Sequence, residues 1–135
     1  MREFGQPAAY DEDTEECAPT GPVSADAGTH LSADAEGLTI AYKYGVRTLY
    51  ASSQGDSTFA SYRINGHRLV YRAGFQVADG PVDGVQHSDG AAVTTQPLGP
   101  LFPHGLFAVH DGENTPGDGD REGTNFKLVR LEKLP

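Results

Sequence analysis

The chain has 135 residues, of which 37% are hydrophobic and none is tryptophan, so it is long enough for one small domain with a modest core. Its formal net charge of −9 argues against nucleic acid or an anionic membrane as a direct partner, because both would be repelled, and favours a cation. Seventeen glycines and nine prolines interrupt the sequence too often for long helices, which predicts an all-β fold.

Residues 1–30 are predicted to be a mostly irregular acidic segment, because they lack an apolar pattern that could bury surface. The segment contains no apolar signal-peptide core, and no stretch of the chain approaches the ~18 apolar residues of a membrane span. The sequence therefore predicts neither an export signal nor a membrane segment. Cys17 is the single cysteine and cannot form a disulfide within the chain.

Residues 31–135 are predicted to form two antiparallel sheets, because apolar and polar residues alternate there between Gly or Asn turns. The expected strands of the first sheet are residues 38–44, 48–53, 58–64 and 68–77. The turn Asn65-Gly66 joins the last two, since both residues tolerate positive φ. The expected strands of a second, incomplete sheet are residues 91–95, 106–110 and 125–131.

An internal repeat supports this organisation. Residues 49–58 and 106–115 match in type at six of ten positions, and each copy is an apolar strand that runs into a Gly-centred acidic turn. The period of 57 residues is typical of stacked, equivalent blades. We therefore predict a partial β-propeller of about two antiparallel four-stranded blades, with residues 1–30 retaining a remnant of an earlier blade. Because repeat folds need ~3 or more units, we expect the open sides to be covered by self-association or by missing blades from another chain.

Acidic residues fall at the predicted turns and strand ends, where they supply hard oxygen ligands. They are Asp34, Glu36, Asp83, Asp89, Asp111, Glu113, Asp118 and Asp120, with the amide of Asn114. Calcium binds six to eight oxygens, and Gly-rich turns let backbone carbonyls approach it. A single Asp-Gly pair is equally explained by turn preference, but the whole set predicts a divalent-cation site.

Other chemistry has weaker signals. The five histidines lack the spacing or cysteine partners of a zinc site. Ser52-Ser53 lacks the Gly-x-Ser-x-Gly elbow of a nucleophile and is interpreted as polar, outward-facing strand positions. A carbohydrate-binding domain would need exposed tryptophan, which the chain does not have.

Several motifs resemble the C-terminal part of the β-propeller phytases, over about residues 29–133. They are Asp34-Ala35-Glu36-Gly37-Leu38, Ala51-Ser52-Ser53-Gln54-Gly55, Asp79-Gly80-Pro81, Asp83-Gly84, Ser88-Asp89-Gly90, Asp111-Gly112-Glu113-Asn114 and Asn125-Phe126-Lys127. The resemblance implies a six-bladed, calcium-dependent, usually secreted 3-phytase that removes phosphates from phytate, myo-inositol hexakisphosphate. It also implies several calcium ions that bridge a phosphate and an attacking water.

The resemblance implies roles for individual residues. It places Asp34, Glu36 and Asp89 in a calcium-lined catalytic cleft. The tight calcium ligands that it implies are Asp83, Asp111, Gly112, Glu113 and Asn114, together with Glu15, although Glu16 replaces the family's glycine.

Two departures from the family bear on activity. Only sixteen residues separate Cys17 from Asp34, where the family has most of a further blade, and the phosphate-gripping residues of the earlier blades are absent. The resemblance therefore does not imply that this chain catalyses the reaction by itself. The alternative interpretation is a non-catalytic calcium-binding β module that assembles through open sheet edges.

Overall fold

The computed structural model describes residues 8–14, 16–22, 25, 28–32, 35–114 and 123–135. The chain divides into two units, residues 1–30 and residues 31–135, and each is described here by itself. No helix in the described ranges is long and apolar enough to cross a membrane.

The first unit contains a short hairpin. Strands β1 (Ala8–Asp11) and β2 (Glu16–Pro19) pair in antiparallel fashion. The Asp11 carboxylate accepts hydrogen bonds from the N–H groups of Asp13 and Thr14 at 2.9 and 3.2 Å, a turn that aspartate side chains favour. This hairpin was not expected in a segment predicted to be mostly irregular. The side chains of β1 are all exposed, so its stability comes from backbone pairing that leaves no apolar pattern in the sequence.

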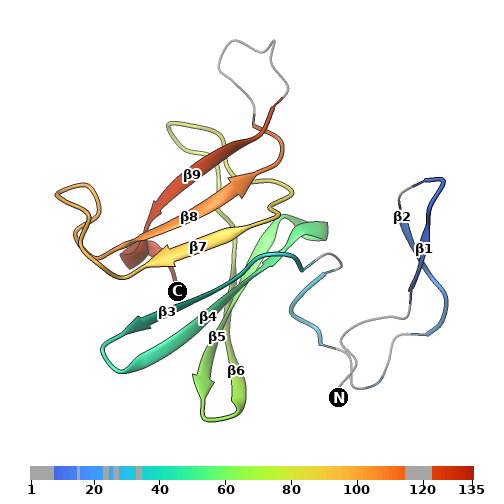
Figure 1. The fold of residues 1–135 in the computed structure, drawn as a ribbon, viewed down its shortest axis with the longest axis horizontal. Coiled ribbons are helices and arrows are strands. Elements are labelled where there is room, and N and C mark those ends of the chain that lie inside the picture. Colours follow the sequence, from blue (N-terminus) through green and yellow to red (C-terminus); the bar gives the residue numbers. More distant parts are fainter. Residues whose placement is uncertain (1–7, 15, 23–24, 26–27, 33–34, 115–122) are drawn as a thin grey trace. The chain divides into compact units, whose positions relative to one another are not determined.

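The second unit consists of two antiparallel sheets, and the all-β prediction is confirmed (Figure 1). In each sheet the strands lie in chain order, β3-β4-β5-β6 and β7-β8-β9. The first sheet comprises β3 (Leu38–Lys43), β4 (Val46–Ser53), β5 (Thr58–Asn65) and β6 (Arg68–Phe75). The second comprises β7 (Ala91–Thr94), β8 (Leu106–Asp111) and β9 (Asn125–Arg130). Short 3₁₀ turns, η1 (Gln54–Asp56) and η2 (Leu131–Lys133), follow β4 and β9.

The seven strands match the predicted ones to within two residues at each end. The predicted repeat falls on β4 and β8, the second strand of each sheet, and the second sheet has three strands as expected. This arrangement is that of neighbouring blades of a partial β-propeller. The hairpin between β5 and β6 turns one residue later than predicted, since Asn65 pairs with Arg68 and Gly66 takes the positive φ of 58°.

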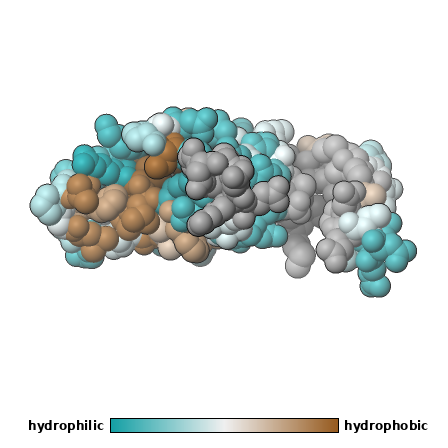
Figure 2. Space-filling model, turned by 90° about the horizontal axis from the view of Figure 1, so that it is seen from above, coloured by the Kyte–Doolittle hydropathy of each residue, from teal (hydrophilic) through white to brown (hydrophobic). Residues whose placement is uncertain are grey.

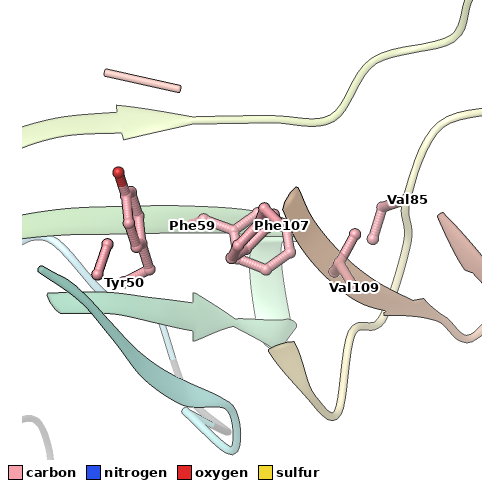
Figure 3. Close-up of a cluster of buried hydrophobic side chains, with 6 residues drawn as sticks. Tyr50, Phe59, Val85, Phe107 and Val109 are labelled. Atoms are coloured by element: carbon pink, nitrogen blue, oxygen red, sulfur yellow. The ribbon is translucent and has the colours of Figure 1, made fainter. Parts of the chain in front are cut away.

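The core lies between the inner faces of the two sheets (Figure 3). Phe59 and Phe107 are 1% and 0% exposed, and their ring centroids lie 5.6 Å apart in an edge-to-face arrangement. Tyr50 packs against Phe107 at 5.6 Å, and Phe75 stacks on Phe59 at 5.4 Å. Such aromatic pairs contribute ~0.5–1.5 kcal/mol beyond their buried area.

The first strands of the two sheets lie side by side (Figure 1). The Val93 N–H on β7 donates to Thr39 Oγ1 on β3 at 3.1 Å. Gly37 fits closely against Gly90, because an added Cβ there would lie 3.0 Å from Gly90 Cα. The segments that precede β3 and β7 therefore meet at one end of the two sheets.

Candidate functional site

Four chain segments gather at this end, namely the described residues of 31–37, 53–57, 86–90 and 110–114, and we call their solvent-exposed side chains the rim. The His110 N–H donates to Gly90 O at 2.9 Å, and the Gly112 N–H donates to Gln86 O at 2.8 Å. These bonds hold the loop before β7 against the end of β8. They bring several of the predicted site residues to one place.

Buried serines at the end of β4 fix the first rim segment. Ser52 accepts a hydrogen bond from the Gly37 N–H on its Oγ at 2.7 Å, and its own N–H donates to Gly37 O at 2.8 Å. Ser53 Oγ accepts from the Ser32 N–H at 2.7 Å. The prediction that both serines face outward is wrong. They are 1% and 0% exposed because they satisfy backbone groups of the segment that covers them.

Asp89 has two side-chain neighbours on the rim. Gln54 Nε2 donates to Asp89 Oδ1 at 2.5 Å, and His110 Nδ1 lies 3.4 Å from Oδ2. The Asp89 side chain nevertheless remains 52% exposed. Glu36 precedes Gly37 and is exposed, and Asp89 precedes Gly90, so the close fit of these glycines places both carboxylates on the same rim.

Asp56 is the most heavily hydrogen-bonded carboxylate of the rim. Its oxygens accept bonds from Thr58 Oγ1 at 2.7 Å and from Ser32 Oγ at 2.9 Å. Partial burial acts to raise the pKa of Asp56, but the hydrogen bonds from Thr58, Ser53 and Ser32 outweigh it and lower the pKa below its ordinary value. Asp56 therefore ties the first rim segment to the turn after β4 in its charged form.

We expect Ser32→Ala to lower the Tm by ~2–4 °C at pH 7 and to have little effect on the Tm near pH 2. A carboxylate whose folded pKa is lowered stabilises the fold above its ordinary pKa, and this contribution is lost as the pH falls through the folded pKa. Thermal unfolding followed by circular dichroism at pH 7, 4 and 2 measures the effect. The matched control is Ser32→Ala in an Asp56→Asn background. If the Tm loss caused by Ser32→Ala depended on pH in the same way there, the pH dependence would not come from Asp56.

Beneath the rim, three predicted ligands converge on a lysine, and we call the group the inner cluster: Asp83, Asp111, Asn114 and Lys127. Lys127 Nζ donates to Asp83 Oδ1 and, at 2.8 Å, to Asn114 Oδ1. It lies 3.1 Å from Asp111 Oδ2. Burial alone would lower the pKa of Lys127, but hydrogen bonds and charge from Asp83 and Asp111 outweigh it and raise the pKa.

Asp111 is the most deeply buried member of the inner cluster, at 0% exposure. Its Oδ1 accepts a hydrogen bond from the Gln86 N–H at 3.0 Å. Its Oδ2 is the one buried side-chain oxygen in the described ranges without an aligned hydrogen bond. The charge of Lys127 is what compensates that oxygen.

The remaining predicted ligands lie elsewhere. Glu113 is 58% exposed, and its Oε1 lies 3.2 Å from His87 Nδ1 on the rim. Glu15, Asp34 and the stretch 118–120 lie outside the described residues. Among the described residues, no three acidic, histidine or cysteine side chains are placed to hold one metal ion. The structure thus divides the predicted set into exposed rim carboxylates and a buried, lysine-bound cluster.

No role was predicted from the sequence for Lys127, Gln54 or His110. On β9, Phe126 and Leu128 are 68% and 57% exposed while Lys127 between them is buried. This is the reverse of the usual apolar-in pattern. The signal in the sequence that could have identified Lys127 is a lysine at an inward position of a strand whose other inward positions are apolar.

Two comparisons with known proteins bear on the family. The family model described as Phytase matches residues 8–135. The chain is also 43% identical over 109 residues to the "3-phytase" of Bacillus subtilis (strain 168). That match covers 79% of this chain and 28% of the relative, so the chain spans less than a third of the relative's length.

Proposed function

The chain belongs to the phytase family, and from this premise we propose that it forms part of a calcium-dependent phosphomonoester hydrolase that acts on phytate. The observation that carries the proposal is the rim, where the half-exposed carboxylate of Asp89 and the exposed one of Glu36 flank the Gly37–Gly90 contact. Several calcium ions, Asp34 as a further cleft residue and a secreted location are parts of the same proposal.

The rim offers suitable chemistry for calcium, because exposed carboxylate oxygens are the ligands that this ion prefers. We assign calcium to Glu36, Asp89 and Glu113 at the rim, and Asp34 and Glu15, which lie outside the described residues, stay predicted ligands. Bound calcium would lower the pKa of a coordinated water and neutralise phosphoryl oxygens. It would also offset the net charge of −9, which otherwise repels a polyanion.

The chain's own residues hold the rim carboxylates in place. Gln54 restrains one oxygen of Asp89, and His110 lies beside the other. Ser52 fixes the backbone next to Glu36 through two hydrogen bonds to Gly37. We further propose that the chain alone has little activity, since a bridge between phosphate and water needs ligands on both sides of a cleft.

The test combines calcium with phytate. We expect millimolar calcium, compared with EDTA, to raise the Tm by about 5–10 °C, because a ligand at ~100 times its Kd stabilises the fold by ~2.7 kcal/mol. Phytate should bind, by isothermal titration calorimetry, in calcium and not in EDTA. A Glu36→Gln/Asp89→Asn variant should lose both effects, while Glu132→Gln, an exposed acid outside the rim, should keep them. Absence of phytate binding in the presence of calcium would sink the proposal.

A second candidate function is a non-catalytic calcium-binding module that assembles with other propeller blades or with its own copies. The exposed outer side of β3 favours it, since Leu38, Ile40 and Tyr42 are 64%, 53% and 63% exposed. Figure 2 shows hydrophobic residues gathered in one brown area of the surface. Sedimentation velocity in calcium tests the assembly of copies of this chain, because a protein that stays monomeric at all concentrations does not self-associate.

A further inference from the structure

We propose that the ammonium group of Lys127 is the resident cation of the inner cluster, so that Asp83, Asp111 and Asn114 are organised by a side chain and not by a metal ion. The proposal concerns the buried residues beneath the rim and is independent of calcium binding by the rim carboxylates. It assigns Lys127 a positioning role for the loop that carries Asp89.

The ammonium group occupies the point where the oxygens of the inner cluster converge. Three oxygens, from Asp83, Asn114 and Asp111, surround Lys127 Nζ at hydrogen-bond or ion-pair distance. Calcium needs its oxygens at ~2.3–2.6 Å and six to eight of them. An ion placed where these oxygens converge would meet the ammonium group itself, and like charges at such a distance repel strongly in a buried site.

Two oxygens of the cluster also accept hydrogen bonds from protein groups other than Lys127. Asp111 Oδ1 accepts from the Gln86 N–H at 3.0 Å. Asn114 Oδ1 accepts from Asn125 Nδ2 at 3.1 Å in addition to Lys127. These bonds orient oxygens of the cluster towards the ammonium, and the charge of Lys127 compensates Asp111 Oδ2, which has no aligned hydrogen bond.

Burial and charge agree with this assignment. The Lys127 side chain is 9% exposed and those of Asp83 and Asp111 are 18% and 0% exposed, so the pairs are shielded from solvent. A buried charge is tolerated when it is paired and hydrogen-bonded, and removing one partner is strongly destabilising.

The inner cluster joins three parts of the chain to one point. Asp83 lies in the loop before β7, Asp111 ends β8, and Lys127 lies on β9 opposite Val109. The loop continues from Asp83 through Gln86, which is bonded to Asp111, to Asp89 on the rim. Lys127 therefore fixes the position of the loop through its contact with Asp83, while Gln54 restrains the Asp89 side chain directly.

The first test observes Lys127 directly in the unaltered 135-residue chain. The sequence has only three lysines, so ¹⁵N-edited spectra of the Nζ groups are simple to assign, with Lys127→Arg identifying the signal. We expect the Lys127 ammonium protons to exchange slowly with water and to keep their shifts during a calcium titration to millimolar concentration. Loss or displacement of that signal as calcium saturates would overturn the proposal, whatever calcium does at the rim.

The second test removes the resident cation. In EDTA, Lys127→Met is expected to lower the Tm by ~10 °C or more, because two carboxylates are left facing each other. Calcium should then restore part of the loss, giving a calcium-dependent Tm shift at least ~5 °C larger than that of the unaltered chain. Arg130→Met, an exposed cation on the same strand, is the matched control and should behave like the unaltered chain.

The outcomes of the two tests separate the alternatives. If Lys127→Met equals the unaltered chain in stability and in calcium response, Lys127 is not the cation of the cluster. If the variant fails to fold in both conditions, the Nζ spectrum of the unaltered chain decides. If the rim binds no calcium, the Tm shift of the unaltered chain vanishes while the slow exchange at Lys127 persists.

Discussion

Replacing Phe107 by alanine is expected to lower the free energy of unfolding by about 3–5 kcal/mol. Phe107 is fully buried on β8 and its ring contacts those of Tyr50, Phe59 and Phe75 on the facing sheet. The substitution removes the main contact of the second sheet with the first and leaves a cavity that the β strands cannot easily fill. Because domains of this size are stable by only ~5–15 kcal/mol, the substitution removes a large fraction of the total stability.

The matched control for this prediction is Phe126→Ala on the neighbouring strand. Phe126 is 68% exposed, so its truncation should change the stability by less than ~1 kcal/mol. Urea unfolding followed by circular dichroism and tyrosine fluorescence measures both variants. Equal losses at the two positions would mean that the core does not lie between the inner faces of the sheets.

Gly112→Ala is expected to lower the stability by about 2–4 kcal/mol and to weaken calcium binding at the rim. A Cβ at Gly112 would lie 2.6 Å from His87 O and 3.3 Å from Gln86 O, and both are backbone atoms that cannot turn aside. The hydrogen bond from the Gly112 N–H to Gln86 O would also be lost. The loop that carries Asp89 must then move away from the end of β8.

Gly80→Ala separates this steric effect from the general effect of replacing a glycine. An added Cβ at Gly80 meets nothing within 4 Å, so its stability should change by less than ~1 kcal/mol. Thermal unfolding in EDTA and in calcium gives both quantities for each variant. A Gly112→Ala protein with unaltered stability and calcium response would contradict the tight fit of the loop.

The local sequence pattern was sufficient to predict the strands of residues 31–135, but not the contacts between them. Alternation and turn residues predicted all seven strands of residues 31–135, since both signals act within a few residues. The hairpin of β1 and β2 was missed because its stabilising bonds involve backbone and an aspartate turn. The alternation of β9 offered a signal for the inward orientation of Lys127, but its partner Asp83 could not be inferred from it, because Asp83 lies 44 residues away along the chain.

For the candidate site, too, the sequence predicted the types of residue but not which side chains meet. The residue types predicted hard oxygen donors, and the described ones do lie on the rim or directly beneath it. Which donors meet was not predictable, because the grouping depends on Lys127 drawing Asp83, Asp111 and Asn114 together while Glu113 pairs with His87. Sequence spacing had placed Glu113 and Asn114 together, although their side chains have different partners.

The strand order within each sheet has a consequence for how such chains change during evolution. Every strand in the described part of the chain pairs only with its neighbours along the chain, so each of these sheets is encoded by one uninterrupted stretch of the gene. A single in-frame duplication or deletion can therefore add or remove a whole sheet without leaving any strand unpaired. Chains that differ by one sheet are accordingly one genetic event apart, and the two similar segments on β4 and β8 are what such a duplication would leave behind.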